Sequence, residues 1–210
     1  MLPGRGLTGP YLHKYLSRME QLRGRNAIIT GASRGIGVHI ARALAAEGVN
    51  LALAARTLSA VEELARELSA SGVRCVAIRA DVGTAQDRAQ LLERAASELG
   101  VIDILVNNAA LERNQAFASF PPSDIEAMLQ VDLVAPIMLT RELLPAMLER
   151  TRGHVINIAS LAGMLAVPGQ VVYAGTKFAV VGLSSGLSDE FSPQGVEVSC
   201  VMPTFTNTEL

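Results

Sequence analysis

The sequence contains no tryptophan and only two cysteines, Cys75 and Cys200, among its 210 residues. Two isolated cysteines cannot form a disulfide framework, a CxxC redox pair or a cysteine-rich metal centre. We therefore expect no metal site and a reducing, cytoplasmic environment. Charge is scarce as well, because charged residues make up 18% of the chain and the formal net charge is −2. A chain without excess positive charge has no general attraction for nucleic acid, so we expect no nucleic-acid partner.

Long apolar runs are also missing, although 50% of the residues are hydrophobic, a content that excludes an intrinsically disordered chain. The longest stretch without a charged residue is Gly153–Thr176, but it contains polar residues such as His154 and Asn157. We interpret it as a buried strand, a loop and the start of a helix, and we expect no membrane span. Residues 1–25 lack the apolar central segment of a secretory signal peptide.

Lysine and tyrosine are rare in this chain. Among the 18 basic residues, the lysines are Lys14 and Lys177, and the three tyrosines are Tyr11, Tyr15 and Tyr173. Tyr173 and Lys177 lie one helical turn apart in the sequence, a spacing that puts both side chains on one face of a helix.

Six apolar runs, most of them preceded by a glycine, predict β-strands. They are Asn26–Thr30, Val49–Ala54, Val73–Ala80, Val101–Val106, His154–Ile158 and Val196–Val201. Runs that are apolar on both faces are typical of a parallel sheet covered by helices on both sides. Helical stretches separate them, at about 36–47, 58–71, 85–99, 124–149 and 172–191. This alternation predicts an α/β fold, a doubly wound, Rossmann-like parallel sheet of six strands in three layers.

Three pairs of residues have the spacing of a helix capping box or its aspartate variant. They are Ser59 with Glu62, Thr84 with Asp87, and Ser123 with Glu126. Each serine or threonine is expected to begin a helix by accepting a hydrogen bond from a backbone N–H group.

Residues 1–24 stand apart as an N-terminal extension, and we expect residues 25–210 to form one domain. Apolar residues recur at helical spacing between Tyr11 and Leu22, and with Lys14 and Arg18 they could form a short basic amphipathic helix. Three roles stay open for it: an arm packed on its own or a neighbouring subunit, a membrane-surface attachment, or a transit peptide.

The first predicted strand leads into Thr30-Gly31-Ala32-Ser33-Arg34-Gly35-Ile36-Gly37 and then into a helix. Gly31 allows a tight turn, Gly35 lets the backbone approach a pyrophosphate, and Gly37 lets the helix pack close to the strand. The helix N-terminus presents unpaired N–H donors and a partial positive charge to phosphate groups. This succession of strand, glycine turn and helix predicts that the domain binds a dinucleotide.

Further motifs, in order along the chain, make the sequence resemble the short-chain dehydrogenase/reductase family. After the glycine turn come Asn107-Asn108-Ala109-Ala110, then Ser160, then Tyr173-x-x-x-Lys177. The resemblance covers about residues 24–210 and implies an oxidoreductase whose Asp81 and Val82 flank the adenine and whose Asn107 supports the central part of the cofactor. The cofactor-binding residues that follow from the turn and the resemblance are Gly31, Ser33, Arg34, Gly35, Ile36, Gly37, Arg56, Asp81, Val82, Asn107, Ala109, Tyr173, Lys177, Pro203 and Thr208.

The end of the second predicted strand favours NADP(H) over NAD(H). An NAD-specific site usually places an acid there, which accepts a hydrogen bond from the ribose 2′-hydroxyl. This chain has Ala55 followed by Arg56, and Arg34 lies inside the glycine turn. A 2′-phosphate carries about −1.5 to −2 charges and suits arginine side chains.

The resemblance implies a catalytic group of Ser160, Tyr173 and Lys177. Ser160 would hydrogen-bond the substrate oxygen, Tyr173 would donate or remove a proton there, and Lys177 would tune Tyr173 and hold the nicotinamide ribose. A free tyrosine has a pKa near 10, and we expect the ammonium of Lys177 and the oxidised nicotinamide to favour the phenolate. Hydride would move between the nicotinamide and the substrate carbon.

Asp132 departs from the family pattern, since Val131-Asp132-Leu133 stands where the family usually has an asparagine that holds a proton-relaying water. Asp132 could hold such a water and is a fourth catalytic candidate. As an anion it would pair with Lys177 and raise the pKa of that lysine. The alternative is that Asp132 is a helix residue fitted to the same bend.

The C-terminal region also departs from the family pattern. Thr204 follows Pro203 where the family usually has glycine, whereas Thr208 matches a threonine that faces the cofactor. Family members normally continue beyond the position of Leu210 with helices that cover the substrate and with a seventh strand. We therefore expect the substrate lid and the seventh strand to be missing.

Two other functions stay open. A nucleotide-sugar epimerase or dehydratase also uses Tyr-x-x-x-Lys, but its usual glycine spacing and larger C-terminal domain both disagree with this chain. The second is an NADP(H)-binding protein that senses redox state or acts as a scaffold without turnover, as the changes at Asp132 and Thr204 could indicate.

The expected substrate is a small alcohol or carbonyl compound with apolar character. A candidate apolar wall, which could equally be core, consists of Leu161, Ala162, Met164, Leu165 and Pro168. The loop Leu111–Pro122, with Arg113 and Phe117, is expected to line the entrance. By resemblance we expect a homodimer or homotetramer formed through the helices at 124–149 and 172–191.

Overall fold

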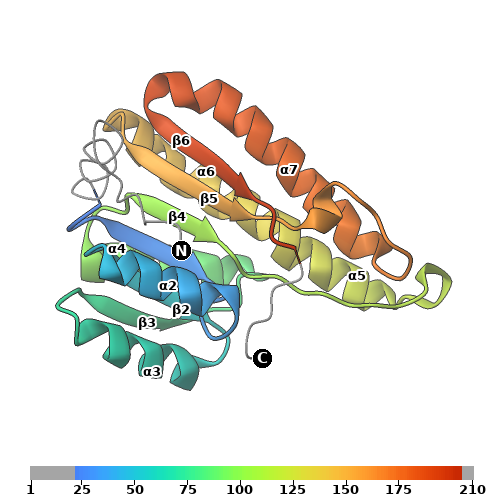
Figure 1. Cartoon of the computed structure of the whole chain (residues 1–210), viewed down its shortest axis with the longest axis horizontal. Helices are drawn as coiled ribbons and strands as arrows, with labels where there is room; N and C mark the ends of the chain where they lie inside the picture. Colours follow the sequence, from blue (N-terminus) through green and yellow to red (C-terminus); the bar gives the residue numbers. More distant parts are fainter. Residues whose placement is uncertain (1–21, 205–210) are drawn as a thin grey trace, which may run out of the picture.

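The apolar runs form one six-stranded parallel sheet with the order β3-β2-β1-β4-β5-β6 (Figure 1). The computed structural model describes residues 22–204, so the expectations for residues 1–21 and for Thr208 lie outside the described residues. The strands are β1 (Asn26–Thr30), β2 (Asn50–Ala55), β3 (Cys75–Arg79), β4 (Ile104–Asn107), β5 (Gly153–Ile158) and β6 (Val196–Val201). The order reverses between β1 and β4, which is the point where a doubly wound sheet opens a ligand crevice.

Helices cover both faces of this sheet, as the two-sided apolar runs predicted. The α-helices are α2 (Ile36–Ala46), α3 (Leu58–Ser69), α4 (Ala85–Leu99), α5 (Pro122–Leu129), α6 (Ala135–Glu149) and α7 (Val171–Phe191). Every residue of β1 is buried, because helices lie above and below it. The structure confirms the α/β class, the six strands and the Rossmann-like topology.

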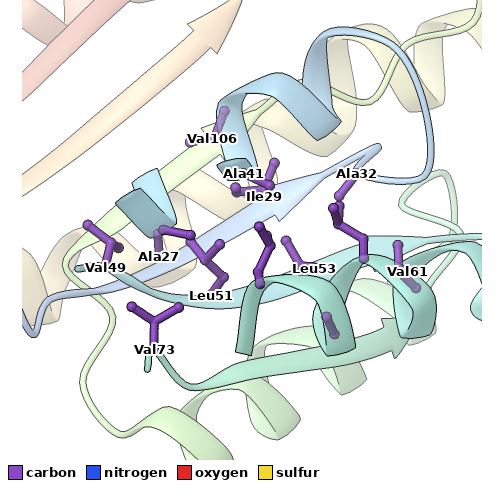
Figure 2. Packing of buried hydrophobic residues seen from close by; sticks show 14 of the residues in the cluster. Ala27, Ile29, Ala32, Ala41, Val49, Leu51, Leu53, Val61, Val73 and Val106 are labelled. Carbon is purple, nitrogen blue, oxygen red and sulfur yellow. The ribbon is translucent and has the colours of Figure 1, made fainter. Parts of the chain in front are cut away.

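Two apolar cores hold the layers together. Figure 2 shows the first core, in which Ile29 of β1 and Leu53 of β2 pack with Val61 of α3. The second core lies on the opposite face, where Leu105 of β4 packs with the α4 and α6 side chains such as Leu139. Side chains alternate between the two faces along a strand, so neighbouring residues of β1 and β2 serve different cores.

The predicted helix 124–149 is wrong as a single element. It consists of α5, a π-helical segment η2 (Gln130–Val134) and α6. A π turn inserts one extra residue into the helix and often marks a functional site. Asp132 lies in this segment and is 1% exposed, so the bend carries it into the interior.

Of the three predicted helix caps, one is confirmed. The Thr84 hydroxyl accepts a hydrogen bond from the Asp87 backbone N–H at 3.1 Å. The other two predictions are wrong, because α3 begins at Leu58 and α5 begins at Pro122. Ser59 and Ser123 therefore already lie in the first turn, and at α5 a proline with its fixed φ begins the helix instead.

Candidate active site

The carboxyl ends of β1 to β4 open into one cleft of about 610 Å³. Its lining comes from the glycine turn, from the ends of β2 and β3, from the segment after β4 and from Tyr173 of α7. The lining residues are Gly31, Ser33, Arg34, Gly35, Ile36, Ala55, Arg56, Thr57, Ala80, Asp81, Val82, Asn108, Ala109, Ala110, Leu111, Glu112, Arg113, Val131 and Tyr173. Residues far apart in the sequence thus meet where the topology of the sheet predicts a ligand site.

The glycine turn admits no side chain at two positions. Gly31 has a φ of +68°, and a Cβ there would lie 2.7 Å from the Ala109 Cα. A Cβ at Gly37 would clash with the Gly31 carbonyl oxygen and lie 2.7 Å from the Asn108 side-chain nitrogen. That nitrogen donates to the carbonyl oxygens of Thr30 at 2.9 Å and Gly31 at 3.0 Å. Asn108 therefore fixes the turn from the neighbouring strand.

The chemistry of the cleft fits a dinucleotide that carries several phosphates. Helix α2 begins after Gly35 with no side-chain cap and no acidic residue in its first turn, so its N–H groups remain available to an anion. Arg34 and Arg56 line the same cleft, and Ala55 at the end of β2 offers no carboxylate. These residues suit a phosphate on the adenosine ribose better than a free 2′-hydroxyl.

Most of the residues that the sequence predicted for cofactor binding lie in this cleft, but not all of them. Those lining it are Gly31, Ser33, Arg34, Gly35, Ile36, Arg56, Asp81, Val82, Ala109 and Tyr173. Gly37 packs behind the turn. Lys177 is 3% exposed, and the Pro203 carbonyl accepts a hydrogen bond from the Leu161 N–H at 3.0 Å. These three residues are not part of the lining.

Asn107, which the resemblance placed in support of the cofactor, lies behind the cleft and is not part of its lining. Its amide nitrogen donates to the Asn157 side-chain oxygen at 2.8 Å and to the Thr140 hydroxyl at 3.4 Å. Its own Oδ1 atom is buried without a hydrogen-bond partner among the described residues. The Asn157 nitrogen continues the network to the Ser184 hydroxyl at 2.9 Å. Asn107 thus joins β4, β5, α6 and α7 inside the protein.

Tyr173, Lys177 and Ser160 come together as the sequence predicted. Tyr173 lies in the first turn of α7, and the Lys177 Nζ atom lies 5.4 Å from the centre of its ring. The same Nζ donates to the Ile158 carbonyl oxygen at the end of β5 at 3.1 Å. Ser160 follows β5, and its hydroxyl accepts a hydrogen bond from the Ala162 N–H at 3.2 Å.

The pKa of Tyr173 differs from the expected direction. Burial raises it above its ordinary value, the nearby Ser160 side chain lowers it, and the negative charges of Glu112 and Asp132 raise it further. The neutral phenol is therefore the favoured form in the protein alone. The expected phenolate depended on the oxidised nicotinamide as well as on Lys177, and in the protein alone burial is the largest effect on this pKa.

Asp132 is buried between the segment after β4 and α7. One carboxylate oxygen accepts a hydrogen bond from the Leu111 N–H at 2.7 Å, and the other accepts from the Thr176 hydroxyl at 3.5 Å. Burial raises the pKa of Asp132 to about 6, against the lowering effect of Lys177. The expected ion pair with Lys177 is wrong, since the described residues form none at this position.

The pKa of Lys177 likewise departs from expectation. The charge of Asp132 does raise it, as predicted, but burial is the larger effect and lowers it overall. The lysine and the aspartate are thus two buried groups that each support the charged form of the other without direct contact.

Sequence reasoning missed Asn108 and Thr57 as parts of the cleft. Asn108 could have been found, because it adjoins Asn107 in the same motif, whereas Thr57 carries no sequence signal. Glu112 lies in the loop Leu111–Pro122 that was expected to line the entrance, but the sequence did not single it out. Within residues 22–204, no cluster of histidine, cysteine, aspartate and glutamate is suited to hold a metal ion. In that same range no helix combines the length and hydropathy of a membrane span.

The sequence matches the short chain dehydrogenase family over residues 25–210. The chain belongs to the short-chain dehydrogenase family. Oxidoreductase UcpA of Escherichia coli is 37% identical over 193 residues, which cover 91% of this chain and 73% of UcpA. Ketoacyl reductase HetN of Nostoc sp. is 36% identical over 189 residues, which cover 90% of this chain and 66% of HetN. This short-chain dehydrogenase therefore spans slightly less than two thirds of HetN.

A solved structure supports the same assignment of this short-chain dehydrogenase. The crystal structure of a metagenomic short-chain oxidoreductase in complex with NADP has a TM-score of 0.83 to this chain, at 34% identity. The match covers 88% of this chain and 84% of that one.

Proposed function

We propose that this protein is an NADP(H)-dependent oxidoreductase that interconverts an alcohol and a carbonyl compound, with Tyr173 as the general acid and base. One observation carries the proposal: the Tyr173 side chain lines the same cleft as the glycine turn, with Lys177 below its ring. A proton donor and a dinucleotide cradle that share one cleft are what a reaction at a carbonyl needs.

Several features support NADP(H) as the cofactor. Arg34 and Arg56 line the cleft, and Ala55 stands where NAD-specific sites carry an acid. The related metagenomic oxidoreductase was solved in complex with NADP. Gly31, Gly35 and the N-terminus of α2 would hold the pyrophosphate, and Asp81 and Val82 would lie beside the adenine. When bound, NADP(H) supplies or accepts the hydride.

The residues of this chain would manage the proton. Burial raises the pKa of Tyr173, so the phenol carries its proton in the protein alone, and the positive charges of Lys177 and of the oxidised nicotinamide that forms would help it to give that proton to a substrate oxygen during reduction. Ser160, which lies beside Tyr173, would hydrogen-bond that oxygen and orient it. Lys177 would fix the position of Tyr173 and approach the nicotinamide ribose. Asp132 would hold the segment after β4 and support the charge on Lys177.

We further propose that the substrate is apolar and that the protein forms a homo-oligomer. Leu161, Met164 and Leu165 are exposed beyond the end of β5, next to the start of α7, and could contact an apolar substrate. Exposed apolar side chains on α6 and α7, such as Met138 and Phe178, support association through these helices.

The experiment that tests the function combines NADPH binding with turnover. NADPH fluorescence has little background here, because the chain has no tryptophan. We expect saturable binding and NADPH oxidation with at least one ketone or aldehyde of a broad panel. Binding without turnover across the panel would contradict the proposed reaction and favour a non-catalytic cofactor-binding protein.

A further inference from the structure

Glu112 lies at the mouth of the cleft, in the segment that follows β4. The Gln170 side-chain nitrogen donates to its Oε1 atom at 2.7 Å, and the Asn114 side chain donates to the same oxygen at 3.4 Å. Gln170 immediately precedes α7, one turn before Tyr173. The other carboxylate oxygen of Glu112, Oε2, receives no hydrogen bond from the described residues. One oxygen is thus held in place, and the second is free for a ligand.

The negative charge of Glu112 acts on Tyr173, Asp132 and Lys177 and favours a higher pKa for each, although burial is the largest effect on all three. Glu112 and Tyr173 line the same cleft, so the carboxylate and the proposed proton donor share one site.

The charges that act on the Tyr173 phenol are those of Glu112 and Asp132, both negative. Arg113 also lines the cleft, but it is not among the groups that act on this phenol. Of these two acids, Glu112 is the one that lines the cleft, so it is the carboxylate that a substrate next to Tyr173 can meet.

The segment that carries Glu112 is held in place and has exposed apolar side chains beside it. The Gln115 N–H donates to the Gly169 carbonyl oxygen at 2.9 Å, so the segment after β4 is joined twice to the segment that precedes α7. That second segment exposes Met164, Leu165 and Val167. The mouth thus combines an apolar wall with one anchored carboxylate.

We propose that Glu112 determines substrate specificity by binding a protonated amino group of an otherwise apolar ketone or alcohol. The free Oε2 atom accepts the ammonium N–H, while Gln170 holds the carboxylate toward Tyr173. An anionic substrate is repelled from the same position, since like charges disfavour binding. This inference rests on the proposed function, because it names the substrate class of the same site.

Three phenyl ketones of matched size test the proposal with NADPH at pH 7: β-aminopropiophenone, butyrophenone and 3-benzoylpropionate. We expect kcat/KM for the amino ketone to exceed that of the neutral ketone about tenfold and the keto acid to be poorest. Raising the salt concentration should shrink this preference, because the ammonium and the carboxylate are partly screened. Equal kcat/KM values for the three ketones would overturn the proposal and leave the proposed oxidoreductase intact.

The variants Glu112→Gln and Gln170→Ala distinguish the effect of the Glu112 charge from the effect of its positioning by Gln170. Glutamine keeps an oxygen for Gln170 but loses the charge, so Glu112→Gln should lose the amino-ketone preference, measured as the ratio of kcat/KM for the amino ketone to kcat/KM for butyrophenone. Gln170→Ala should lower the preference partly, through a higher KM. Glu98→Gln, an exposed carboxylate on α4, is the matched control and should keep the preference. If Glu112→Gln lowers kcat/KM equally for all three ketones, Glu112 has only a structural role and the proposal is contradicted.

Calorimetric binding of the same ketones to the NADP⁺ complex keeps the two proposals distinguishable. Tighter binding of the amino ketone than of butyrophenone, lost in Glu112→Gln, supports the inference even if no ketone is turned over. Equal binding of all three ketones by the wild-type protein contradicts it.

Discussion

The Asp132 carboxylate accepts a hydrogen bond from the backbone N–H of Leu111 at 2.7 Å. This contact joins the π-helical segment η2 to the segment after β4, which carries Glu112 and Arg113 into the cleft. The other oxygen of the same carboxylate reaches the Thr176 hydroxyl on α7. One buried acid thus connects three elements around Tyr173.

Replacement of Asp132 by asparagine is expected to remove a pH-dependent part of the stability. Burial raises the Asp132 pKa from 3.8 to about 6, so the folded protein binds this proton more tightly than the unfolded chain does. The resulting stabilisation is fully present below about pH 4 and is lost as the pH rises through about 6, a change of about 3 kcal/mol at most.

Urea unfolding of both proteins between pH 4 and pH 8 measures this effect. The difference in free energy of unfolding should shift in favour of Asp132→Asn across that window. Asparagine can still accept the Leu111 N–H, so the contact itself is preserved. Parallel stability curves would mean that Asp132 is ionised throughout.

Replacement of Tyr173 by phenylalanine should abolish nearly all turnover and leave the cofactor site intact. The change removes the phenolic hydroxyl and keeps the ring that lines the cleft. We expect kcat to fall about a hundredfold to ten-thousandfold, the usual contribution of a positioned acid or base. Steady-state kinetics and an NADPH titration check this together. Retained turnover would remove Tyr173 from the proposed role.

Replacement of Arg34 or Arg56 by glutamine should weaken NADPH binding and spare NADH. Each change removes a guanidinium from the cleft, and a charge-assisted contact with phosphate accounts for about tenfold to a hundredfold in affinity. Fluorescence titrations with both cofactors measure the ratio of the dissociation constants. Arg66→Gln on α3, where the arginine is exposed, is the matched control. Tighter binding of NADH than NADPH by the wild-type protein would contradict the assignment.

Replacement of Gly37 by alanine should both destabilise the protein and weaken NADPH binding. The added Cβ would clash with the Gly31 carbonyl oxygen and press on the Asn108 side chain, and overpacking of this kind costs about 1–3 kcal/mol. Gly186→Ala in α7 is the control, because a Cβ there meets no atom within 4 Å. Thermal unfolding should show a lower free energy of unfolding for Gly37→Ala, and one that is higher by up to about 1 kcal/mol for Gly186→Ala. An unchanged Gly37→Ala protein would show that the turn can relax.

The arrangement of strands and helices could be predicted because each signal is local. A buried two-sided strand is an unbroken apolar run, and a glycine marks most helix ends. The glycine turn could be predicted for the same reason, since its signal lies in residues 30–37, although Asn108 of a distant segment also holds it. The bend at η2 could not, because π turns are rare and the residues of this one lie in a continuous helical stretch with no glycine to mark the bend.

Asn107 and Asn108 show most directly where a motif stops being informative. The two residues are adjacent, and successive side chains along a strand point to opposite sides. The Asn107 side chain points into the protein, where it hydrogen-bonds Asn157, whereas the Asn108 side chain hydrogen-bonds the backbone of the glycine turn. The motif predicts that asparagines matter here, but the direction of each side chain depends on how β4 lies between its neighbours.

By itself the sequence determined the fold class, the place of the dinucleotide turn and the pairing of Tyr173 with Lys177, since each depends on short-range spacing. Only the tertiary structure decided the protonation preferences and the charges at the mouth of the cleft. The pKa of Tyr173 rises because burial and two acids distant in the sequence act on it. Desolvation and through-space charge depend on three-dimensional proximity, and no pattern along the chain records them.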